Sequence, residues 1–209
     1  MIHLLLARHG ETDWNAAARY QGQADPALNQ AGRRQAYCLA ARLARWKVDV
    51  IYGSDLQRAR ETATIIAKAL HTEPVPEPRL RELSFGVIEG LTFAEAKAHY
   101  PAMMTAWLED GQQPPLGGET MDAFARRLLS FFDDLKHRHE GQAVLLVTHG
   151  GPIRELLRLA LGLAPQGHWY FAVDNGSLSE LVLYGDQPLL RQLNDTSHLN
   201  GSYWNREKE

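Results

Sequence analysis

The alternation of short apolar runs with longer amphipathic stretches constrains the fold of this chain more than any other feature of its sequence. Residues 2–7 are apolar apart from His3, and residues 143–148 form a second strongly apolar run. Runs of this length without polar alternation are typical of strands that are covered on both faces. Further strand candidates lie at residues 49–52, 178–184 and 189–193, and residues 80–83 are a further strand or the exit from one.

The stretches between these runs have the spacing of helices that pack on a sheet. After Asn29, which suits a helix N-cap, apolar side chains recur on one face at helical spacing. The widest apolar stripe lies over residues 121–135 and indicates a long helix that is buried along one side. Strands and helices in alternation predict an α/β fold, a three-layer α/β/α sandwich with a mostly parallel central sheet.

The regular alternation is interrupted between residues 85 and 118. There the sequence predicts a helix near residues 92–100, a second helical piece near 103–109 and a loop over 111–118. We interpret this stretch as a small helical lid inserted in the fold. A chain of 209 residues is long enough to bury a substantial core. We therefore expect a single domain over 1–209 that carries the lid at about 85–118.

Charge and hydropathy argue against several kinds of partner. The formal net charge is −3, which provides no field that would recruit nucleic acid or an anionic membrane. The apolar run at residues 2–7 is too short for the core of a signal peptide, and no later stretch reaches the length of a membrane span. We expect a soluble cytoplasmic protein without nucleic-acid or membrane partners, and the sequence leaves its oligomeric state open.

Two of the predicted strands end in the same dipeptide, His-Gly. His9 follows the run at 2–7, and His149 follows the run at 143–148. Adjacent strands would bring both imidazoles to one edge of the sheet, where ligands bind in open α/β folds. The Gly150-Gly151-Pro152 step before the next helix also presents backbone N–H groups and the positive end of a helix dipole to an anion.

The neighbouring charges favour an anion over a metal at this edge. A cation site gathers carboxylates or thiolates around its histidines, whereas Arg8 places a permanent positive charge beside His9. Arg58, at the start of a predicted helix, could direct its guanidinium group to the same edge, and Glu82 lies just before the lid. A nucleophile, two arginines, a second imidazole and one carboxylic acid together suffice for phosphoryl transfer.

A series of short motifs runs along the chain in a defined order. They are Arg8-His9-Gly10-Glu11-Thr12 with Trp14-Asn15, Gly22-Gln23-Ala24-Asp25, Ser54-Asp55-Leu56-Gln57-Arg58-Ala59 with Thr62-Ala63, Arg81-Glu82-Leu83-Ser84-Phe85-Gly86 with Glu89-Gly90, Gly117-Gly118-Glu119-Thr120, and Val147-Thr148-His149-Gly150. Their order and spacing resemble those of the histidine phosphatase superfamily, in its phosphoglycerate-mutase-like branch. The resemblance covers nearly the whole chain.

The resemblance implies a role for each matching residue. His9 would be the nucleophile that forms a phosphohistidine, and Glu82 would be the proton donor and later the base. The phosphate pocket would consist of Arg8, Arg58 and His149. The residues that line the substrate phosphate would be Asn15, Gln21, Gly22 and the backbone of Gly150. The reaction would need no metal ion or other cofactor.

Departures from the mutase pattern favour hydrolysis. Phe85 and Phe93 stand where mutases of this branch carry a tyrosine and a lysine that bind phosphoglycerate, and Gly151 stands where they usually carry asparagine. Without this polar grip, a monophosphorylated intermediate would not be retained, and the phosphohistidine would react with water. The compact length and residues 85–90 are also similar to those of small bacterial phosphatases, α-ribazole phosphatases among them. We therefore expect a phosphomonoesterase that acts on a small-molecule phosphate ester, with α-ribazole phosphate as a candidate substrate.

Three alternatives remain open at this point. A phosphoglycerate mutase, which is a phosphotransferase, would need a bisphosphoglycerate primer. A noncatalytic module that binds a phosphate ligand could use the same fold. A metal hydrolase could enlist His137 with His139, or Asp195 with His198; we expect the first pair to face solvent and the second to lie in a turn after a strand.

Overall fold

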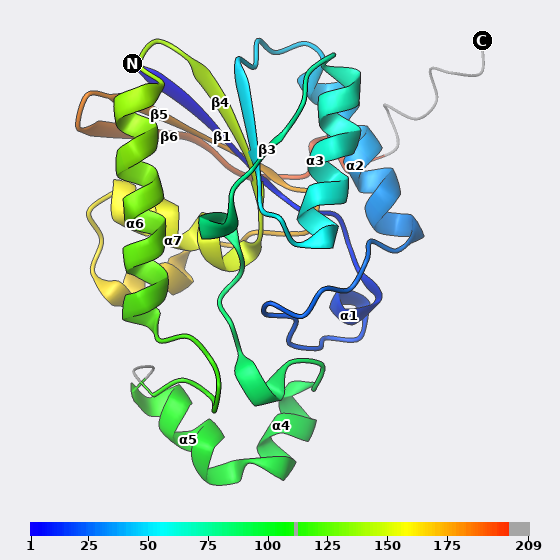
Figure 1. The fold of residues 1–209 in the computed structure, drawn as a ribbon, viewed down its shortest axis with the longest axis vertical. Coiled ribbons are helices and arrows are strands. Elements are labelled where there is room, and N and C mark those ends of the chain that lie inside the picture. Colours follow the sequence, from blue (N-terminus) through cyan, green and yellow to red (C-terminus); the bar gives the residue numbers. More distant parts are fainter. Residues whose placement is uncertain (111–112, 201–209) are drawn as a thin grey trace.

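The computed structural model describes residues 1–110 and 113–200. Its sheet has the strand order β3-β2-β4-β1-β5-β6 (Figure 1). The strands are β1 (Ile2–Arg8), β2 (Val50–Gly53), β3 (Val75–Pro76), β4 (Ala143–Thr148), β5 (Leu178–Tyr184) and β6 (Gln187–Asp195). The first four are parallel, β5 is antiparallel to β1, and β6 is antiparallel to β5. Among the described strands, only β5 therefore runs against the common direction.

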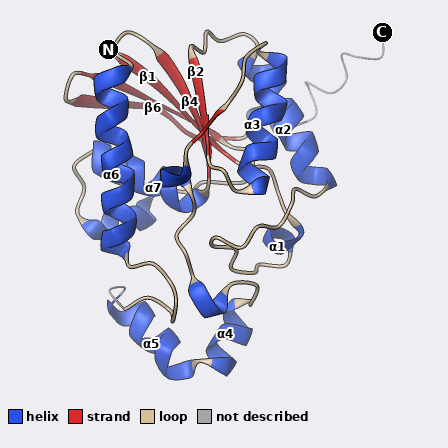
Figure 2. Ribbon diagram, viewed as in Figure 1, coloured by secondary structure: helices blue, strands red, loops and turns tan. Residues whose placement is uncertain are grey.

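Helices cover both faces of the sheet (Figure 2). α2 (Gln30–Leu43) and α3 (Gln57–Ala69) pack on one face, where Leu5 and Leu145 point. α6 (Met121–Arg138) and α7 (Gly150–Ala160) pack on the other, where Leu4 and Leu146 point. Successive side chains of a strand point to opposite faces, so an unbroken apolar run can fill two cores at once. The predicted three-layer sandwich with a mostly parallel sheet is confirmed.

We predicted a strand or strand exit over residues 80–83, but the strand in this part of the chain lies earlier, at Val75–Pro76. The strand is β3, which pairs Tyr52 with Val75 and Gly53 with Pro76. Val75 and Pro76 are both exposed, and a proline cannot donate to a ladder, so β3 is confined to the sheet edge. Leu80 ends a 3₁₀ turn (Pro78–Leu80) and is buried in the core.

The 85–118 segment lies beyond the carboxyl ends of the parallel strands, at the lower end of Figure 1. It contains a 3₁₀ turn (Gly86–Ile88), α4 (Phe93–His99) and α5 (Pro101–Asp110), close to the predicted helices. A small apolar cluster of its own, Ile88, Ala96 and Met104, is separate from the two cores of the sheet. In the predicted loop, residues 111–112 lie outside the described part of the chain, and 113–118 contain no helix or strand.

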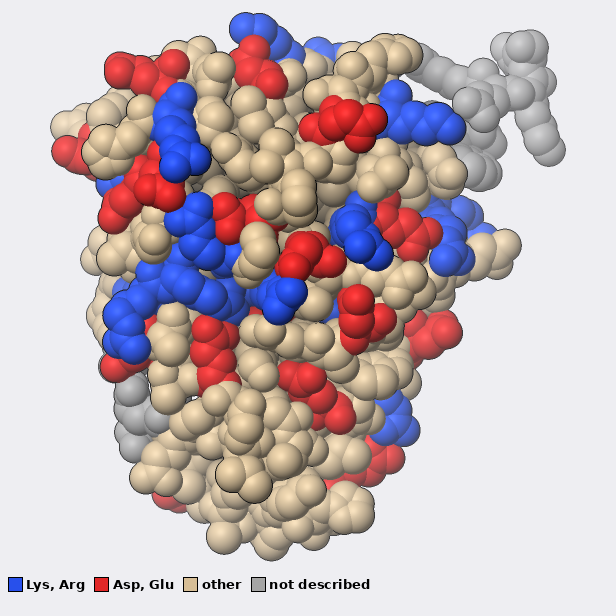
Figure 3. Space-filling view, viewed as in Figure 1, with Lys and Arg blue, Asp and Glu red and all other residues tan. Residues whose placement is uncertain are grey.

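Over residues 1–110 and 113–200, no helix is both long and apolar enough to span a bilayer. On the face shown in Figure 3, acidic and basic side chains lie near one another over the upper part of the molecule, and the lower end is largely uncharged.

Candidate active site

The two His-Gly histidines meet because their strands are neighbours in the sheet. In the parallel β1–β4 pair, Arg8 is in register with Thr148, so His9 and His149 leave the sheet side by side. The His9 backbone N–H donates to the Thr148 carbonyl at 2.9 Å. The ring centroids of His9 and His149 lie 5.0 Å apart with an interplanar angle of 63°. Both side chains are buried, with exposed fractions of 2% for His9 and 0% for His149.

The surroundings of His9 fix the tautomer and the charge of its ring. Its Nδ1 lies 2.6 Å from the carbonyl oxygen of Gly10. A carbonyl only accepts, so Nδ1 carries the hydrogen and Nε2 retains its lone pair. Burial, together with the positive charges of Arg58 and Arg8, holds the pKa of His9 well below its usual value. The imidazole is therefore neutral at physiological pH, as a nucleophile must be.

Arg58 is a buried cation whose two Nη atoms are committed to the loop before it. They donate to the carbonyls of Gly22 at 2.7 Å and Ala24 at 2.8 Å. Burial lowers the pKa of Arg58 to about 10, although Glu82 opposes the shift, so the side chain stays charged at neutral pH. Arg8 is similarly anchored, by a bond from its Nη1 to the Val173 carbonyl at 2.7 Å, and burial lowers its pKa too.

Each of these anchored side chains, and His149, has a buried polar atom that could bind a ligand. The Nε atoms of Arg8 and Arg58 and the Nδ1 of His149 are buried and have no hydrogen-bond partner within residues 1–110 and 113–200. His149 Nε2 lies 2.8 Å from the Ser54 hydroxyl oxygen, which orients the ring. Buried polar atoms are rarely left unpaired unless a ligand or water satisfies them. Two cationic donors and an imidazole nitrogen beside His9 suit an oxyanion such as phosphate.

Glu82 lies at the same end of the sheet, and the backbone holds its carboxylate. Its Oε1 accepts from the Leu83 N–H at 2.9 Å, and its Oε2 accepts from the Gly151 N–H at 3.1 Å. A Cβ atom at residue 151 would lie 2.1 Å from Glu82 Oε1. Glycine at this position, noted above as a departure from mutases, is therefore a requirement of the observed Glu82 conformation.

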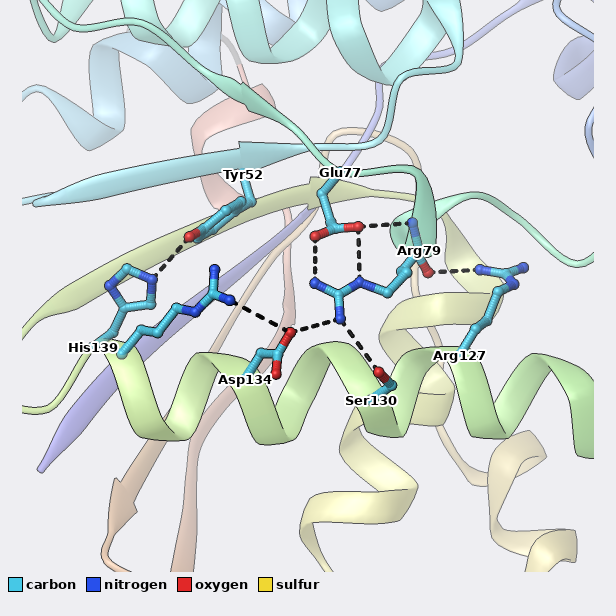
Figure 4. A network of polar contacts seen from close by, with 8 residues as sticks. Tyr52, Glu77, Arg79, Arg127, Ser130, Asp134 and His139 are labelled. Atoms are coloured by element: carbon cyan, nitrogen blue, oxygen red, sulfur yellow. Dashed lines mark hydrogen bonds and ion pairs between the residues drawn. The ribbon is translucent and has the colours of Figure 1, made fainter.

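Arg127 on α6 fixes the chain around Glu82, and Figure 4 shows its contact with Arg79. Its guanidinium donates to the carbonyls of Arg79 and Arg81, both at 2.7 Å, and of Glu82 at 2.9 Å. Glu119 holds the same guanidinium through two bonds of 2.7 and 2.8 Å. The stretch before Glu82 is not part of the sheet, so its carbonyl oxygens have no strand partner. The Arg127 side chain supplies their hydrogen bonds instead.

The four residues that the resemblance assigns to the substrate phosphate differ in what they offer. Asn15, in the short helix α1 (Asp13–Ala16), has its Oδ1 occupied by Thr12 and Asn175, which leaves its amide hydrogens for a ligand. Gln21 is buried, and its Oε1 has no partner in the described residues. Gly22 has a φ of +52° and binds Arg58 through its carbonyl. Gly150 begins α7, so its backbone lies at a helix N-terminus.

Sequence reasoning missed Arg154 and Asn175. Arg154, one turn into α7, lies close to Arg8, since a Cβ atom at Gly150 would be 3.6 Å from Arg8 Nε and 3.8 Å from Arg154 Nη1. Asn175 donates to the His9 carbonyl at 3.2 Å and to Asn15 Oδ1 at 3.2 Å. Arg154 follows His149 by little more than one turn of the predicted helix. The sequence therefore did contain a signal for a positive charge close to His149. Asn175 lies in a loop before β5, and nothing in the sequence indicated its contacts.

A cleft of about 730 Å³ opens beside Glu82 and Gly151. Most of its lining is aromatic or aliphatic, and it includes Tyr20, Phe85, Trp107, Phe124, His168 and Trp169. Arg154 is the only lysine or arginine among its described lining residues. The cleft therefore continues the site from the proposed proton donor into a largely apolar space.

The histidines considered for a metal site are engaged elsewhere. His137 is exposed, but His139 is buried against the Tyr52 hydroxyl at 2.9 Å, so the expectation that both face solvent was wrong for His139. His198 is also buried, with Nε2 2.8 Å from the Gly176 carbonyl, and Asp195 pairs with Arg42. In the described part of the chain, no three His, Cys, Asp or Glu residues are grouped to hold a metal ion.

A mostly parallel sheet whose carboxyl edge carries a neutral histidine, a second imidazole and two buried arginines is suited to a protein that binds phosphate groups. The model of the histidine phosphatase superfamily (branch 1) matches residues 4–196. The chain belongs to this family.

Relatives within the family carry several functional names. Phosphoserine phosphatase 1 of Hydrogenobacter thermophilus is 35% identical over 97% of this chain and 97% of its own length. Phosphoglycerate mutase-like protein 4 of Arabidopsis thaliana is 36% identical over 94% of this chain and 86% of its own. The crystal structure of the α-ribazole phosphatase from Shigella flexneri has a TM-score of 0.87 and 30% identity, over 92% of this chain and 96% of that one.

Proposed function

We propose that this protein is a phosphomonoesterase that hydrolyses a small-molecule phosphate ester through a phosphohistidine on His9. The observation that carries the proposal is the state of His9, a neutral imidazole with Nδ1 bonded to Gly10 and Nε2 available. Next to it lie buried donors on Arg8 and Arg58 that have no partner in the described chain. A nucleophile and an oxyanion site in contact are the minimum for transfer of a phosphoryl group.

In the first step, His9 Nε2 attacks phosphorus and the bond to the ester oxygen breaks. The Nε atoms of Arg8 and Arg58, with His149, bind the nonbridging oxygens, whose charge must be balanced throughout. Glu82, protonated at the start of this step, gives its proton to the leaving alkoxide. In the second step, Glu82 takes a proton from water, the resulting hydroxide attacks the phosphohistidine, and phosphate and neutral His9 are released.

The cleft supports hydrolysis over mutase activity. A phosphoglycerate mutase must hold a bisphosphorylated intermediate while it turns, and this intermediate carries a carboxylate and a second phosphate. The described lining of the cleft offers Arg154 as its only lysine or arginine, and Phe85 is part of the wall. An alcohol released here would leave before it could be rephosphorylated. The candidate substrates are α-ribazole phosphate, from the structural neighbour, and phosphoserine, from the sequence relative.

The proposal is tested by phosphate release from α-ribazole phosphate, phosphoserine and 3-phosphoglycerate in excess chelator. Wild type should turn over at least one ester, and His9→Ala should turn over none. Brief reaction with ³²P-labelled substrate should label wild type with an acid-labile, base-stable phosphate. Equal turnover by both proteins would remove His9 from the reaction. Conversion of 3-phosphoglycerate to its isomer, dependent on a bisphosphoglycerate, would identify a mutase, and binding without turnover would identify a binding module.

A further inference from the structure

The cleft beside Glu82 is larger than a small hydrophilic alcohol requires. Its volume of about 730 Å³ is that of a site for a ligand of many atoms, since such sites span roughly 300–1,000 Å³. Glu82 and Gly151 are part of its wall, so the alcohol that receives the proton of Glu82 would extend into this space. A serine or glycerate leaving group would leave most of it empty.

Aromatic side chains from separate parts of the chain form the wall. Tyr20, Phe85 and Trp107 contact one another, with ring centroids 5.1 to 5.9 Å apart. Phe124 comes from α6, and Trp169 comes from the 3₁₀ turn Pro165–Tyr170. Trp169 is 69% exposed, with the Arg154 guanidinium 5.9 Å from its ring. Aromatic walls with an exposed indole suit a flat aromatic ligand.

One polar group in this wall is held by a buried carboxylate. His168 lines the cleft, and its Nδ1 lies 3.1 Å from Glu155 Oε2. Glu155 is 1% exposed and also accepts from Arg158 at 2.7 Å. Burial favours the neutral acid, but the bonds from His168 and Arg158 outweigh it and keep the pKa of Glu155 below its usual value.

The ionised Glu155 decides how His168 can act. A carboxylate only accepts, so Nδ1 of His168 carries the hydrogen of this bond. Nε2 is therefore the ring nitrogen left for a ligand in the cleft. The rings of Phe124 and Trp169 are edge-to-face with the His168 ring, with centroids 6.2 and 4.9 Å away, and these contacts add to the Glu155 bond in orienting it.

We propose that the cleft binds the alcohol half of the substrate as an aromatic group, and that Nε2 of His168 forms a hydrogen bond with a polar atom of that group. This inference rests on the proposed function and narrows its substrate class to phosphate esters of alcohols that carry an aromatic ring. His168 is a specificity residue that contacts the leaving group, and Glu155 is a positioning residue that acts through His168.

Matched esters test the aromatic part. Adenosine 5′-phosphate and α-ribazole 5′-phosphate share the phosphorylated ribose of ribose 5-phosphate and add a ring. At least one aromatic ester should exceed ribose 5-phosphate in kcat/KM by about tenfold or more, the scale of one ring stacked on aromatic side chains. A kcat/KM for ribose 5-phosphate within twofold of the values for both aromatic esters would overturn the inference. It would not contradict the proposal that the protein is a phosphatase.

His168→Phe tests the polar part, because it keeps a ring in place and removes the hydrogen bond. The variant should lose about 5- to 10-fold in kcat/KM for the preferred aromatic ester and less than twofold for ribose 5-phosphate. His137→Phe, an exposed histidine on α6, is the matched control and should change neither value. An equal loss with both esters would show a structural role only and reject the hydrogen bond.

Binding separates failure of this inference from failure of the proposed reaction. In a His9→Ala background, the intact esters can be titrated by the fluorescence of Trp107 and Trp169, which line the cleft. The aromatic ester should bind more tightly than ribose 5-phosphate, and His168→Phe should reduce that difference. This readout holds even if wild type hydrolyses nothing. Equal dissociation constants for all three esters would overturn the inference.

Discussion

At the scale of single residues, the atoms that the site can offer to a ligand depend on which side-chain nitrogens already form hydrogen bonds within the protein. Both Nη atoms of Arg58 donate to the backbone carbonyls of residues 22 and 24, and only its Nε has no partner in the described residues. The Nδ1 of His9 is likewise hydrogen-bonded to the carbonyl oxygen of its neighbour Gly10. Bonds within the protein therefore orient Arg58 and His9 and leave one defined nitrogen of each side chain for the phosphate that we propose as the ligand. Such preorganisation avoids reorganisation at the moment of reaction.

Gly151→Asn should disable Glu82 without unfolding the protein. A Cβ atom at this position would meet Glu82 Oε1 at 2.1 Å, so the carboxylate must move away from the leaving oxygen. We expect kcat/KM for an alkyl phosphate, which reports the steps up to formation of the phosphohistidine, to fall by about 100-fold, the scale of general acid catalysis. The loss in kcat/KM should be much smaller for 4-nitrophenyl phosphate, whose leaving group needs no proton. Equal losses of kcat/KM for the two esters would contradict the role of Glu82 as proton donor.

At the scale of elements, α6 supports the active site although it contributes none of the predicted catalytic residues. Arg127 binds three carbonyls of the 79–82 stretch, and Glu119 braces it from the end of the 85–118 segment. Arg79 extends this network to Glu77, Ser130 and Asp134 (Figure 4). The chain before Glu82 is thus fastened to a helix, which allows an irregular stretch to hold the carboxylate that we propose as the proton donor.

Arg127→Ala should lower the free energy of unfolding by about 2–4 kcal/mol, because three carbonyls and the Glu119 carboxylate lose a charged partner. Urea unfolding at pH 7.5 measures the change, and kcat should fall as well. Arg138→Ala, on the same helix, is the matched control. Arg138 is 67% exposed and lies 3.9 Å from Asp134, so its loss should cost less than about 0.5 kcal/mol. Similar destabilisation by both variants would refute a special role for Arg127.

The elements also show why the sequence predicted some features and not others. β1 and β4 are buried on both faces, so their apolar runs were clear, and the His-Gly residues after them were found with the strands. β3 was missed because it is an exposed edge of two residues, one of them proline. Asn175 and Arg127 were missed because their roles depend on contacts between segments far apart in sequence. Individual polar side chains carry no periodic signal for such contacts.

For the whole molecule, the buried histidines couple stability to pH. Burial holds the pKa values of His9 and His149 well below the usual value, and that of His198 is lowered for the same leading reason. The folded protein therefore keeps these rings neutral, whereas the unfolded chain protonates them near pH 6.5. Above that pH they contribute no pH dependence. Below it the unfolded state binds more protons, so stability falls as the pH falls.

Urea unfolding between pH 7.5 and 5.5, in phosphate-free buffer, should show this loss. Well below pH 6.5, each such histidine contributes a slope of up to about 1.4 kcal/mol per pH unit. His149→Gln should reduce the slope by one histidine's share. His137→Gln changes an exposed ring and should leave the slope unchanged. A wild-type stability that is flat over this range would contradict the neutral, buried state of these rings.

The position of β1 within the sheet has a consequence for biosynthesis. The strand that delivers His9 is translated before both of its neighbours in the sheet, β4 and β5, yet it lies between them. Leu4 is paired with Val144 on one side and with Leu181 on the other. Contacts of such long sequence separation form slowly, because the intervening chain must be ordered first. His9 is thus translated before the strands that hold it in place. Until β4 and β5 have been made, the apolar strand β1 has no partners in the sheet and is open to chaperone binding.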